Sequence, residues 1–405
     1  MQIPQRIVPT ILFGAFDRHN LGDLLFPHVA ARLLDDDNLL FAGVAERDLS
    51  HAGGFRVHSI SKLAKVFGNR PINILHVGGE LLTCEAWPAA VMVQPPEQVQ
   101  PIIQRLEARA DERGVWTRDT LEIPALAPYV ASRELFPEAI NVIYNAVGGV
   151  ELNERDQPFR TEVITKLSES DYLSIRDQQT RVHLSHYGIH SHLVPDPAVM
   201  VAELFGERIE QCVHAGEVAG IDATFPQGYI AFQFSADFGD DATLVQIAGQ
   251  LDQVTALSGY GVALFRAGAA PWHDDLECYR RLERFMKSTQ VKVFDSLNIW
   301  DICALIANSR VYCGSSLHGR IVAMAFGVPR VNLSHPHNEN RSGKQAAYAA
   351  TWELPGIHHT IAVAEISAGV QQAMVIDQEQ LKIHSQALMA KYLEEFTTIL
   401  ALLSN

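Results

Sequence analysis

The chain has 405 residues, of which 47% are hydrophobic and 20% are charged, and its formal net charge is −15. This length suggests two or three domains of about 150 residues each, and the composition is that of a globular protein. The negative charge repels polyanions and argues against a nucleic-acid partner. The sequence contains no apolar run of membrane-spanning length and no signal-peptide pattern at its start, so we expect a cytoplasmic protein.

The first half of the chain alternates short apolar segments with helical patterns. Strands are expected at residues 8–13, 39–44, 72–77, 139–147, 171–175 and 192–194. The loop after the first strand contains Asn20, and helical periodicity runs over residues 24–34, with Asp23 placed to interact with the positive end of the helix dipole. Residues 80–137 are rich in proline and predict an irregular region with a helix near 99–113.

The second half repeats this alternation after a hinge expected near residues 198–226. Strands are predicted at residues 229–234, 262–266, 291–294 and 311–313, and helices at 242–257, 275–287 and 298–307. Strands separated by helices form parallel sheets. The sequence therefore predicts an α/β fold with two Rossmann-like domains, residues 1–200 and 201–377, that face each other across a cleft. The amphipathic C-terminal segment, residues 378–405, is expected to pack across both domains as a helix.

The segment 311–329 gives the strongest indication of chemistry. A short strand is followed by a loop of small residues that contains Ser315 and Ser316, and apolar residues then recur at helical spacing until Gly327. His318 therefore lies in the first turn of a helix that follows a strand. Ligands of open α/β sheets bind beside such corners, and the N–H groups and dipole of a helix start favour an anion. We therefore predict an anionic substrate.

Five short motifs, taken in chain order, resemble the polysaccharide pyruvyl transferase family. They are Asn20-x-Gly22-Asp23, Val77-Gly78-Gly79, Ser174-Ile175-Arg176-Asp177, Val194-Pro195-Asp196-Pro197 and Gly314-Ser315-Ser316-Leu317-His318-Gly319. The resemblance covers roughly residues 10–350. It implies a GT-B-like fold of two domains, the first on the acceptor side and the second on the donor side. It also implies transfer of the enolpyruvyl unit of phosphoenolpyruvate to sugar hydroxyls, which leaves a pyruvate ketal.

The resemblance assigns roles to residues on the donor side of this reaction. His318 matches the family's histidine, and a side chain that gives and takes a proton near neutral pH suits the transfer. Arg176 matches an arginine that contacts phosphoenolpyruvate. Many members carry a further arginine two residues before the histidine, where this chain has Ser316. Either Arg320 replaces that arginine, or Ser315, Ser316 and backbone N–H groups hold the donor, or the chain uses another donor.

Four further site residues are predicted, of which Asn20 and Asp23 are expected to orient the acceptor. Asp23 is a candidate catalytic residue, Asn20 a candidate acceptor ligand, and Gly79 a position where the backbone approaches the substrate closely. Lys344 resembles a lysine that follows the last strand in the family. The expected partners are a small anionic donor and a saccharide acceptor, with no cofactor beyond phosphoenolpyruvate as the donor substrate. Two questions stay open: whether the chain forms a homo-oligomer, and whether it contacts a membrane surface if the acceptor carries a lipid.

Two other functions stay open at this point. One is a GT-B glycosyltransferase that uses a nucleotide sugar and holds its diphosphate at the same helix start. The other is a non-catalytic saccharide-binding or assembly protein of the same fold. No metal site is predicted, because the histidines that lie close together in the sequence have no acidic or cysteine partner at ligand spacing. These histidines are His335, His337, His358 and His359.

Overall fold

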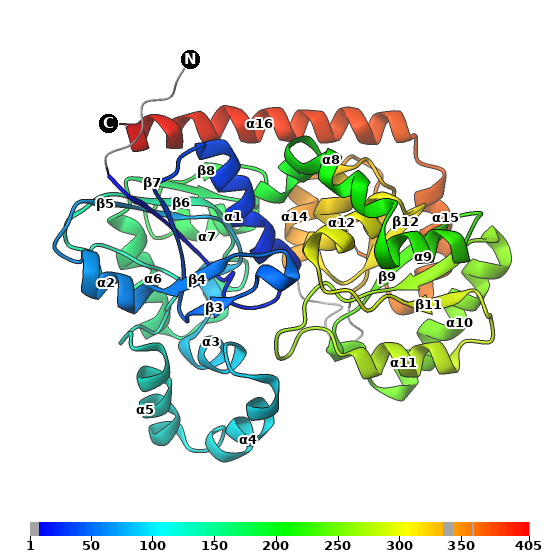
Figure 1. Cartoon of the computed structure of the whole chain (residues 1–405), viewed down its shortest axis with the longest axis horizontal. Helices are drawn as coiled ribbons and strands as arrows, with labels where there is room; N and C mark the ends of the chain where they lie inside the picture. Colours follow the sequence, from blue (N-terminus) through cyan, green and yellow to red (C-terminus); the bar gives the residue numbers. More distant parts are fainter. Residues whose placement is uncertain (1–7, 335–342, 359, 405) are drawn as a thin grey trace. The chain divides into compact units, whose positions relative to one another are not determined.

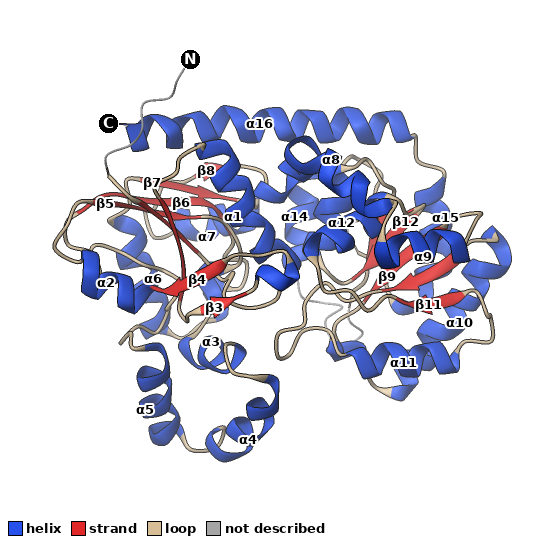
Figure 2. Ribbon diagram, viewed as in Figure 1, coloured by secondary structure: helices blue, strands red, loops and turns tan. Residues whose placement is uncertain are grey.

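The computed structural model describes residues 8–334, 343–358 and 360–404. The chain forms two compact units, Met1–Pro197 with Lys391–Asn405, and Ala198–Ala390. Each unit contains a largely parallel β-sheet with helices packed against it (Figure 1, Figure 2). The predicted α/β class, with parallel sheets flanked by helices, is confirmed.

The sheet of the first unit has eight strands in the order β3-β4-β2-β1-β5-β6-β7-β8. They are β1 (Thr10–Phe13), β2 (Leu39–Gly43), β3 (Arg47–Asp48), β4 (Arg56–Ser59), β5 (Ile72–His76), β6 (Ala139–Val147), β7 (Tyr172–Ile175) and β8 (His192–Leu193). All neighbouring strands are parallel except β3 and β4. The loops that follow β1, β5, β6, β7 and β8 therefore lie at one edge of the sheet.

The first unit contains the helices α1 (Leu21–Leu34), α2 (Ile60–Phe67), α3 (Ala86–Met92), α4 (Pro96–Leu106), α5 (Ala110–Leu121), α6 (Gln157–Ser168) and α7 (Gln178–Ser185). Helix α4 lies away from the sheet, and its buried residues form a separate small cluster with Val91 of α3. Successive side chains of a strand point to opposite faces. Ile11 and Phe13 accordingly share one core cluster with apolar residues of α2, α6 and α7, whereas Leu12 and the buried residues of α1 lie outside that cluster.

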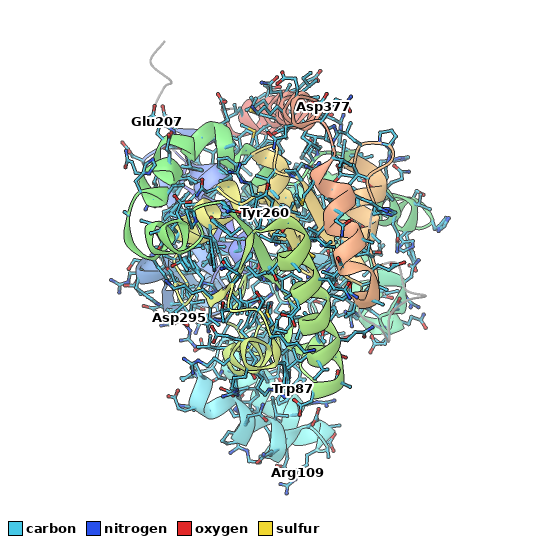
Figure 3. All side chains as sticks on the ribbon, turned by 90° about the vertical axis from the view of Figure 1, so that its right-hand side faces the viewer. Trp87, Arg109, Glu207, Tyr260, Asp295 and Asp377 are labelled. Carbon is cyan, nitrogen blue, oxygen red and sulfur yellow. The ribbon has the colours of Figure 1, made fainter. Side chains whose placement is uncertain are left out.

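Residues 80–137 contain more regular secondary structure than predicted. They contain α3, α4 and α5, and the predicted single helix over 99–113 is wrong, because α4 ends at Leu106 and α5 begins at Ala110. Trp116 on α5 packs edge to face on Trp87 of α3, with ring centroids 5.5 Å apart. This tertiary contact needs the chain to turn between α4 and α5, near Arg109, which is labelled with Trp87 in Figure 3.

The second unit is built on a five-stranded parallel sheet with the order β11-β10-β9-β12-β13. Its strands are β9 (Tyr229–Gln233), β10 (Gly261–Leu264), β11 (Val291–Val293), β12 (Val311–Gly314) and β13 (Arg330–Asn332). Its helices are α8 (Val201–Val213), α9 (Gly216–Thr224), α10 (Asp241–Ser258), α11 (Leu276–Phe285), α12 (Ile299–Ala307), α13 (Leu317–Ala325), α14 (Lys344–Trp352) and α15 (Ile366–Met374). The segment predicted as a hinge thus consists mainly of α8 and α9.

The last helix, α16 (Gln378–Ser404), contributes to both units. Its residues from Lys391 onward belong to the first unit, where the Tyr392 hydroxyl accepts a hydrogen bond from Asn145 Nδ2 at 2.8 Å. Tyr392 is fully buried, so this bond fixes the end of the chain to β6. No helix in the described ranges is both long and apolar enough to cross a membrane.

Candidate functional site

Polar residues of the second unit meet at the carboxyl edge of its sheet. Gln233 is the last residue of β9, Ser316 lies in the loop after β12, and Asp274 lies in the loop after β10. The Gln233 amide nitrogen donates to both Asp274 carboxylate oxygens at 2.9 Å, and its amide oxygen accepts a hydrogen bond from the Ser316 N–H at 2.8 Å. The side chain of one buried glutamine at the end of β9 therefore joins two loops that are far apart in sequence.

Helix α13 begins where the sequence predicts it, and its first turn carries His318. Ser316 is the N-cap, with extended backbone angles, and its hydroxyl accepts a hydrogen bond from the Gly319 N–H at 3.2 Å. A Cβ atom on Gly319 would lie 2.5 Å from the Tyr312 ring, so only glycine lets the helix pack this closely on β12. His318 is the second helical residue and is 7% exposed. A ligand would reach His318 only through this small exposed surface.

The Ser315 side chain also takes part in the loop structure. Its hydroxyl oxygen accepts a hydrogen bond from the Ser235 N–H at 2.9 Å, and its carbonyl accepts one from the Gln345 side chain. Lys344 precedes Gln345 as the exposed first residue of α14, so its helix starts beside the Ser315 loop. The Ser315 hydroxyl also donates to Gln233 Oε1 at 3.5 Å, so it would have to give up this bond to bind an anion. The Ser316 hydroxyl accepts a bond and can still donate one, so it remains a candidate donor to an anion.

Arg320, on α13, lies in a buried group of charges. Its guanidinium is fully buried and donates to Glu353 Oε2 at 2.6 and 3.1 Å and to Asn332 Oδ1 at 2.9 Å. Arg330, also buried, binds the same Glu353 carboxylate. The Arg320 guanidinium thus has no exposed surface and binds protein groups in this structure, and its contact with substrate stays a prediction. The ion pair depends on the tertiary structure, because Glu353 lies 33 residues further along the chain.

Asp274 is a candidate residue that the sequence analysis missed. Burial raises the pKa of this carboxyl to about 7, although hydrogen bonds from Gln233 and from the Ala267 and Gly268 N–H groups oppose the rise. Asp274 therefore changes charge near neutral pH, next to the loop that starts α13. No local pattern marks it, since the burial that raises its pKa results from tertiary packing around the loop after β10.

We expect the Asp274→Asn variant to change the pH dependence of stability. The pKa of Asp274 is about 7 in the folded protein and near 3.8 in an unfolded chain, so the folded state holds an extra proton between these values. The stabilisation from Asp274 is therefore largest at low pH and falls as the pH rises toward 7. The advantage of wild type over Asp274→Asn in urea unfolding should shrink by about 2 kcal/mol between pH 5 and pH 8.

Asp240→Asn is the matched control for this measurement. Asp240 is an exposed N-cap whose pKa is lowered by hydrogen bonds from Thr243. Its stabilisation is complete above its unfolded pKa of 3.8 and is lost only toward acid pH. The Asp240→Asn difference should therefore be the same at pH 5 and pH 8. A constant difference for Asp274→Asn as well would show that Asp274 has no raised pKa.

Three predicted residues come together at the carboxyl edge of the first sheet. Asn20 is the N-cap of α1, and its side-chain oxygen lies 3.5 Å from the Asp23 nitrogen. Gly79 follows β5 with a φ of +100°, and a Cβ atom there would lie 3.0 Å from Asp23 Oδ1. Glycine at position 79 is thus required both by its left-handed backbone and by the nearby Asp23 carboxylate.

Arg176, directly after β7, lies in a buried group of charges. It is 1% exposed, and its two terminal nitrogens bind Asp196 Oδ2 at 2.9 Å and Glu80 Oε2 at 2.7 Å. Glu80 in turn accepts a hydrogen bond from the Val150 N–H at 2.9 Å. Both terminal nitrogens of Arg176 already bind carboxylates in this structure. Contact between Arg176 and a donor anion therefore stays a prediction from the resemblance. Asp177 caps α7 through the Thr180 N–H.

The histidines considered for a metal site give no such site within the residues that the structure describes, where no cluster of three or more metal-ligating side chains occurs. His358 Nε2 lies 2.7 Å from the Gln372 side-chain oxygen. His335, His337 and His359 lie outside the described residues.

Comparisons with known proteins agree on family and fold. The model of one family, polysaccharide pyruvyl transferase, matches residues 20–338, a range that holds every predicted site residue except Lys344. No curated protein sequence matches the chain. The structure is similar to UDP-GlcNAc 2-epimerase from Methanocaldococcus jannaschii in complex with UDP-GlcNAc and UDP, with a TM-score of 0.52, 12% identity, and coverage of 95% of this chain and 98% of that chain.

A second similar structure is the α,α-trehalose 6-phosphate synthase from Burkholderia multivorans. It has a TM-score of 0.49 and 12% identity, with coverage of 98% of this chain and 96% of the synthase. The likeness to the epimerase, at 12% identity, carries information on the fold alone. The fold is the GT-B-like α/β type, with a Rossmann-like sheet in each unit.

Proposed function

The chain belongs to the polysaccharide pyruvyl transferase family and is a transferase, and on this premise we propose that it moves the pyruvyl group of phosphoenolpyruvate onto two hydroxyls of a saccharide. The observation that carries the proposal is the extent of the family match, which runs from Asn20 in the first unit to beyond His318 in the second. The matched range thus includes the polar carboxyl edges of both sheets, where α/β folds bind ligands.

The proposed reaction needs proton transfer and anion binding but no oxidant. The methylene carbon of phosphoenolpyruvate takes up a proton and becomes a methyl group, while the oxygens of two saccharide hydroxyls bond to the neighbouring carbon. The carbon–oxygen bond to phosphate breaks, and the two hydroxyl protons are balanced by the new methyl proton and the proton on the released hydrogen phosphate. The protein must therefore supply an acid and base group and a site for a phosphate and a carboxylate.

Residues of the second unit fit the donor half of this reaction. His318 would move the proton, and Ser315 and Ser316 at the start of α13 would donate hydrogen bonds to the phosphate or carboxylate, with the helix dipole favouring the negative charge. Lys344 at the start of α14 would add a positive charge beside the same loop. In the first unit, Asn20 and Asp23 would orient the acceptor hydroxyls.

Arg176 fits the proposal best as a positioning residue. Its guanidinium holds Glu80 and Asp196 at the same sheet edge as Asp23 and Gly79. A direct contact with phosphoenolpyruvate, as the resemblance implies, would require one of these carboxylates to give up its place. A variant that keeps the positive charge, Arg176→Lys, tests the positioning role because lysine cannot bind both carboxylates in the same fork geometry.

The test of the proposed function is saccharide-dependent release of phosphate. Purified protein is incubated with phosphoenolpyruvate and a panel of saccharides, and the product is examined for a new methyl signal by NMR. We expect phosphate release that needs both substrates, and protection against thermal unfolding by phosphoenolpyruvate. Protection by uridine or guanosine diphosphate with none by phosphoenolpyruvate would instead favour a nucleotide-sugar glycosyltransferase. Binding of saccharides without any phosphate release would favour a non-catalytic protein.

A further inference from the structure

The loop between β1 and α1 holds a charged side chain that the proposed function does not use. This loop contains Asp17 and Arg18 and lies at the same sheet edge as Asn20 and Asp23. Asp17 anchors it, because its carboxylate accepts hydrogen bonds from the Val44 N–H at 2.7 Å, the Ala45 N–H at 3.1 Å and the Tyr129 hydroxyl at 2.7 Å. These three hydrogen bonds hold the loop in place next to Arg18.

Arg18 lies against Tyr129 and Cys84. Its Nη1 is 3.3 Å from the Tyr129 hydroxyl oxygen and 4.0 Å from Cys84 Sγ, and the guanidinium carbon is 5.1 Å from the centroid of the Tyr129 ring. Burial raises the pKa of the Cys84 thiol and raises that of Tyr129 well above its usual range. Both neighbours are therefore neutral. The negative charges that act on Arg18 are those of Asp23 and Asp17, and neither carboxylate forms an ion pair with the guanidinium.

The guanidinium of Arg18 keeps unused hydrogen-bond donors. Its Nε is buried and has no hydrogen-bond partner among the residues that the structure describes, and none of the ion pairs formed by those residues includes Arg18. Arg176 and Arg320 differ from Arg18, because both are buried and bind carboxylates directly. A guanidinium carries five N–H donors in one plane, and two of them can grip a carboxylate or phosphate side by side.

Asp23 offers a complementary open group nearby. It is 9% exposed, and its carboxylate accepts no hydrogen bond from a side chain or backbone group in the described part of the chain. The Asp23 charge acts on Arg18 through space without a direct ion pair. A sugar hydroxyl is a natural donor to such a carboxylate, whereas an acidic group suits the guanidinium.

We propose that Arg18 binds a carboxylate or phosphate group of an acidic saccharide, while Asp23 accepts a hydrogen bond from a hydroxyl of the same molecule. The identification of this ligand as the acceptor rests on the proposed function. The placement of an oxyanion at Arg18 rests on the open donors of the guanidinium alone. A uronic acid and a sugar phosphate share the required chemistry, so both serve as probes.

The test is calorimetric binding to the full chain with glucuronate, galacturonate, glucose 1-phosphate, galactose 1-phosphate and their neutral sugars. Arg18→Gln should raise the dissociation constant of the acidic probe that binds best by about 10- to 100-fold and leave the neutral sugars unaffected. Arg18→Lys should lose less affinity, because it keeps the charge but not the planar fork. Arg56→Gln, at an exposed arginine of the same unit, should bind as the wild type does.

Thermal unfolding of each variant checks that it is folded. If Arg18→Gln does not fold, the affinity of Arg18→Lys for the acidic sugars is compared with that of wild type instead. The inference is overturned if wild type binds acidic sugars no better than neutral ones, or if the Arg18 variants bind them as tightly as wild type. Loss of phosphoenolpyruvate binding without loss of acidic sugar binding would also overturn it. Arg18-dependent binding of acidic sugars in a protein that releases no phosphate would support this inference and reject the proposed function.

Discussion

Replacing Glu353 with glutamine should lower the free energy of unfolding by about 3–5 kcal/mol, because removal of one partner leaves buried charges uncompensated. The Glu353 carboxylate lies between two guanidinium groups, with Arg320 Nη2 at 2.6 Å and Arg330 Nε at 2.9 Å, and all three side chains are fully buried. Glutamine would leave two positive charges close together and turn an amide N–H toward N–H donors. We expect the melting temperature to fall by about 10 °C.

The control for this change is Glu277→Gln. Glu277 forms an ion pair of similar length with Arg284, at 2.7 Å, but the two side chains are 56% and 64% exposed. Exposed pairs contribute little, so this variant should change the free energy of unfolding by less than about 0.5 kcal/mol. Equal losses in the two variants would show that the buried carboxylate is not needed to hold Arg320 and Arg330.

Glu353 also gives this prediction a pH signature. Burial alone would raise the pKa of Glu353, but Arg330 and Arg320 lower it to about 2, against 4.5 in an unfolded chain. A carboxyl with a lowered pKa stabilises the fold fully above its unfolded pKa and loses this effect as the pH falls toward its folded pKa. The difference between wild type and Glu353→Gln should therefore be constant at neutral pH and shrink between pH 4.5 and pH 2.

The His318→Asn variant should lose about 100- to 10,000-fold in kcat for saccharide-dependent phosphate release, the range that a positioned proton donor contributes. His318 lies in the first turn of α13, two residues after the Ser316 cap, and none of the helix hydrogen bonds requires an imidazole. Asparagine keeps a polar side chain of smaller size at this position. We therefore expect the fold to survive while proton transfer is lost.

His214→Asn is the control for the activity measurement. His214 is exposed at the end of α8 in the same unit, so its replacement should leave kcat unchanged. Thermal unfolding of both variants separates a loss of activity from a loss of fold. If His318→Asn kept kcat within a few-fold of wild type, His318 would not be the proton-transfer group of the proposed reaction.

Local patterns predicted the elements that depend on neighbouring residues. Helix α13 starts at its serine cap and ends before Gly327, which has a φ of +65°, as the small-residue loop and the glycine predict. The alternation of strands and helices likewise gave parallel sheets in both halves. The division near Arg109 between α4 and α5 was not predictable in this way, because it depends on the packing of Trp116 against Trp87.

The sequence by itself determined the alternation of strands and helices, the α/β class, and the placement of Asn20, Asp23, Ser315 and His318 after the carboxyl ends of strands, since caps, periodicity and parallel crossovers are local properties. Only the tertiary structure decided which charged side chains form ion pairs within the protein and which keep unused hydrogen-bond donors. It buries Arg320 against Glu353 and Arg176 against Glu80, joins Gln233 to Asp274, and leaves donors of Arg18 unused. Charge compensation and burial depend on residues far apart in the chain, so no local pattern records them.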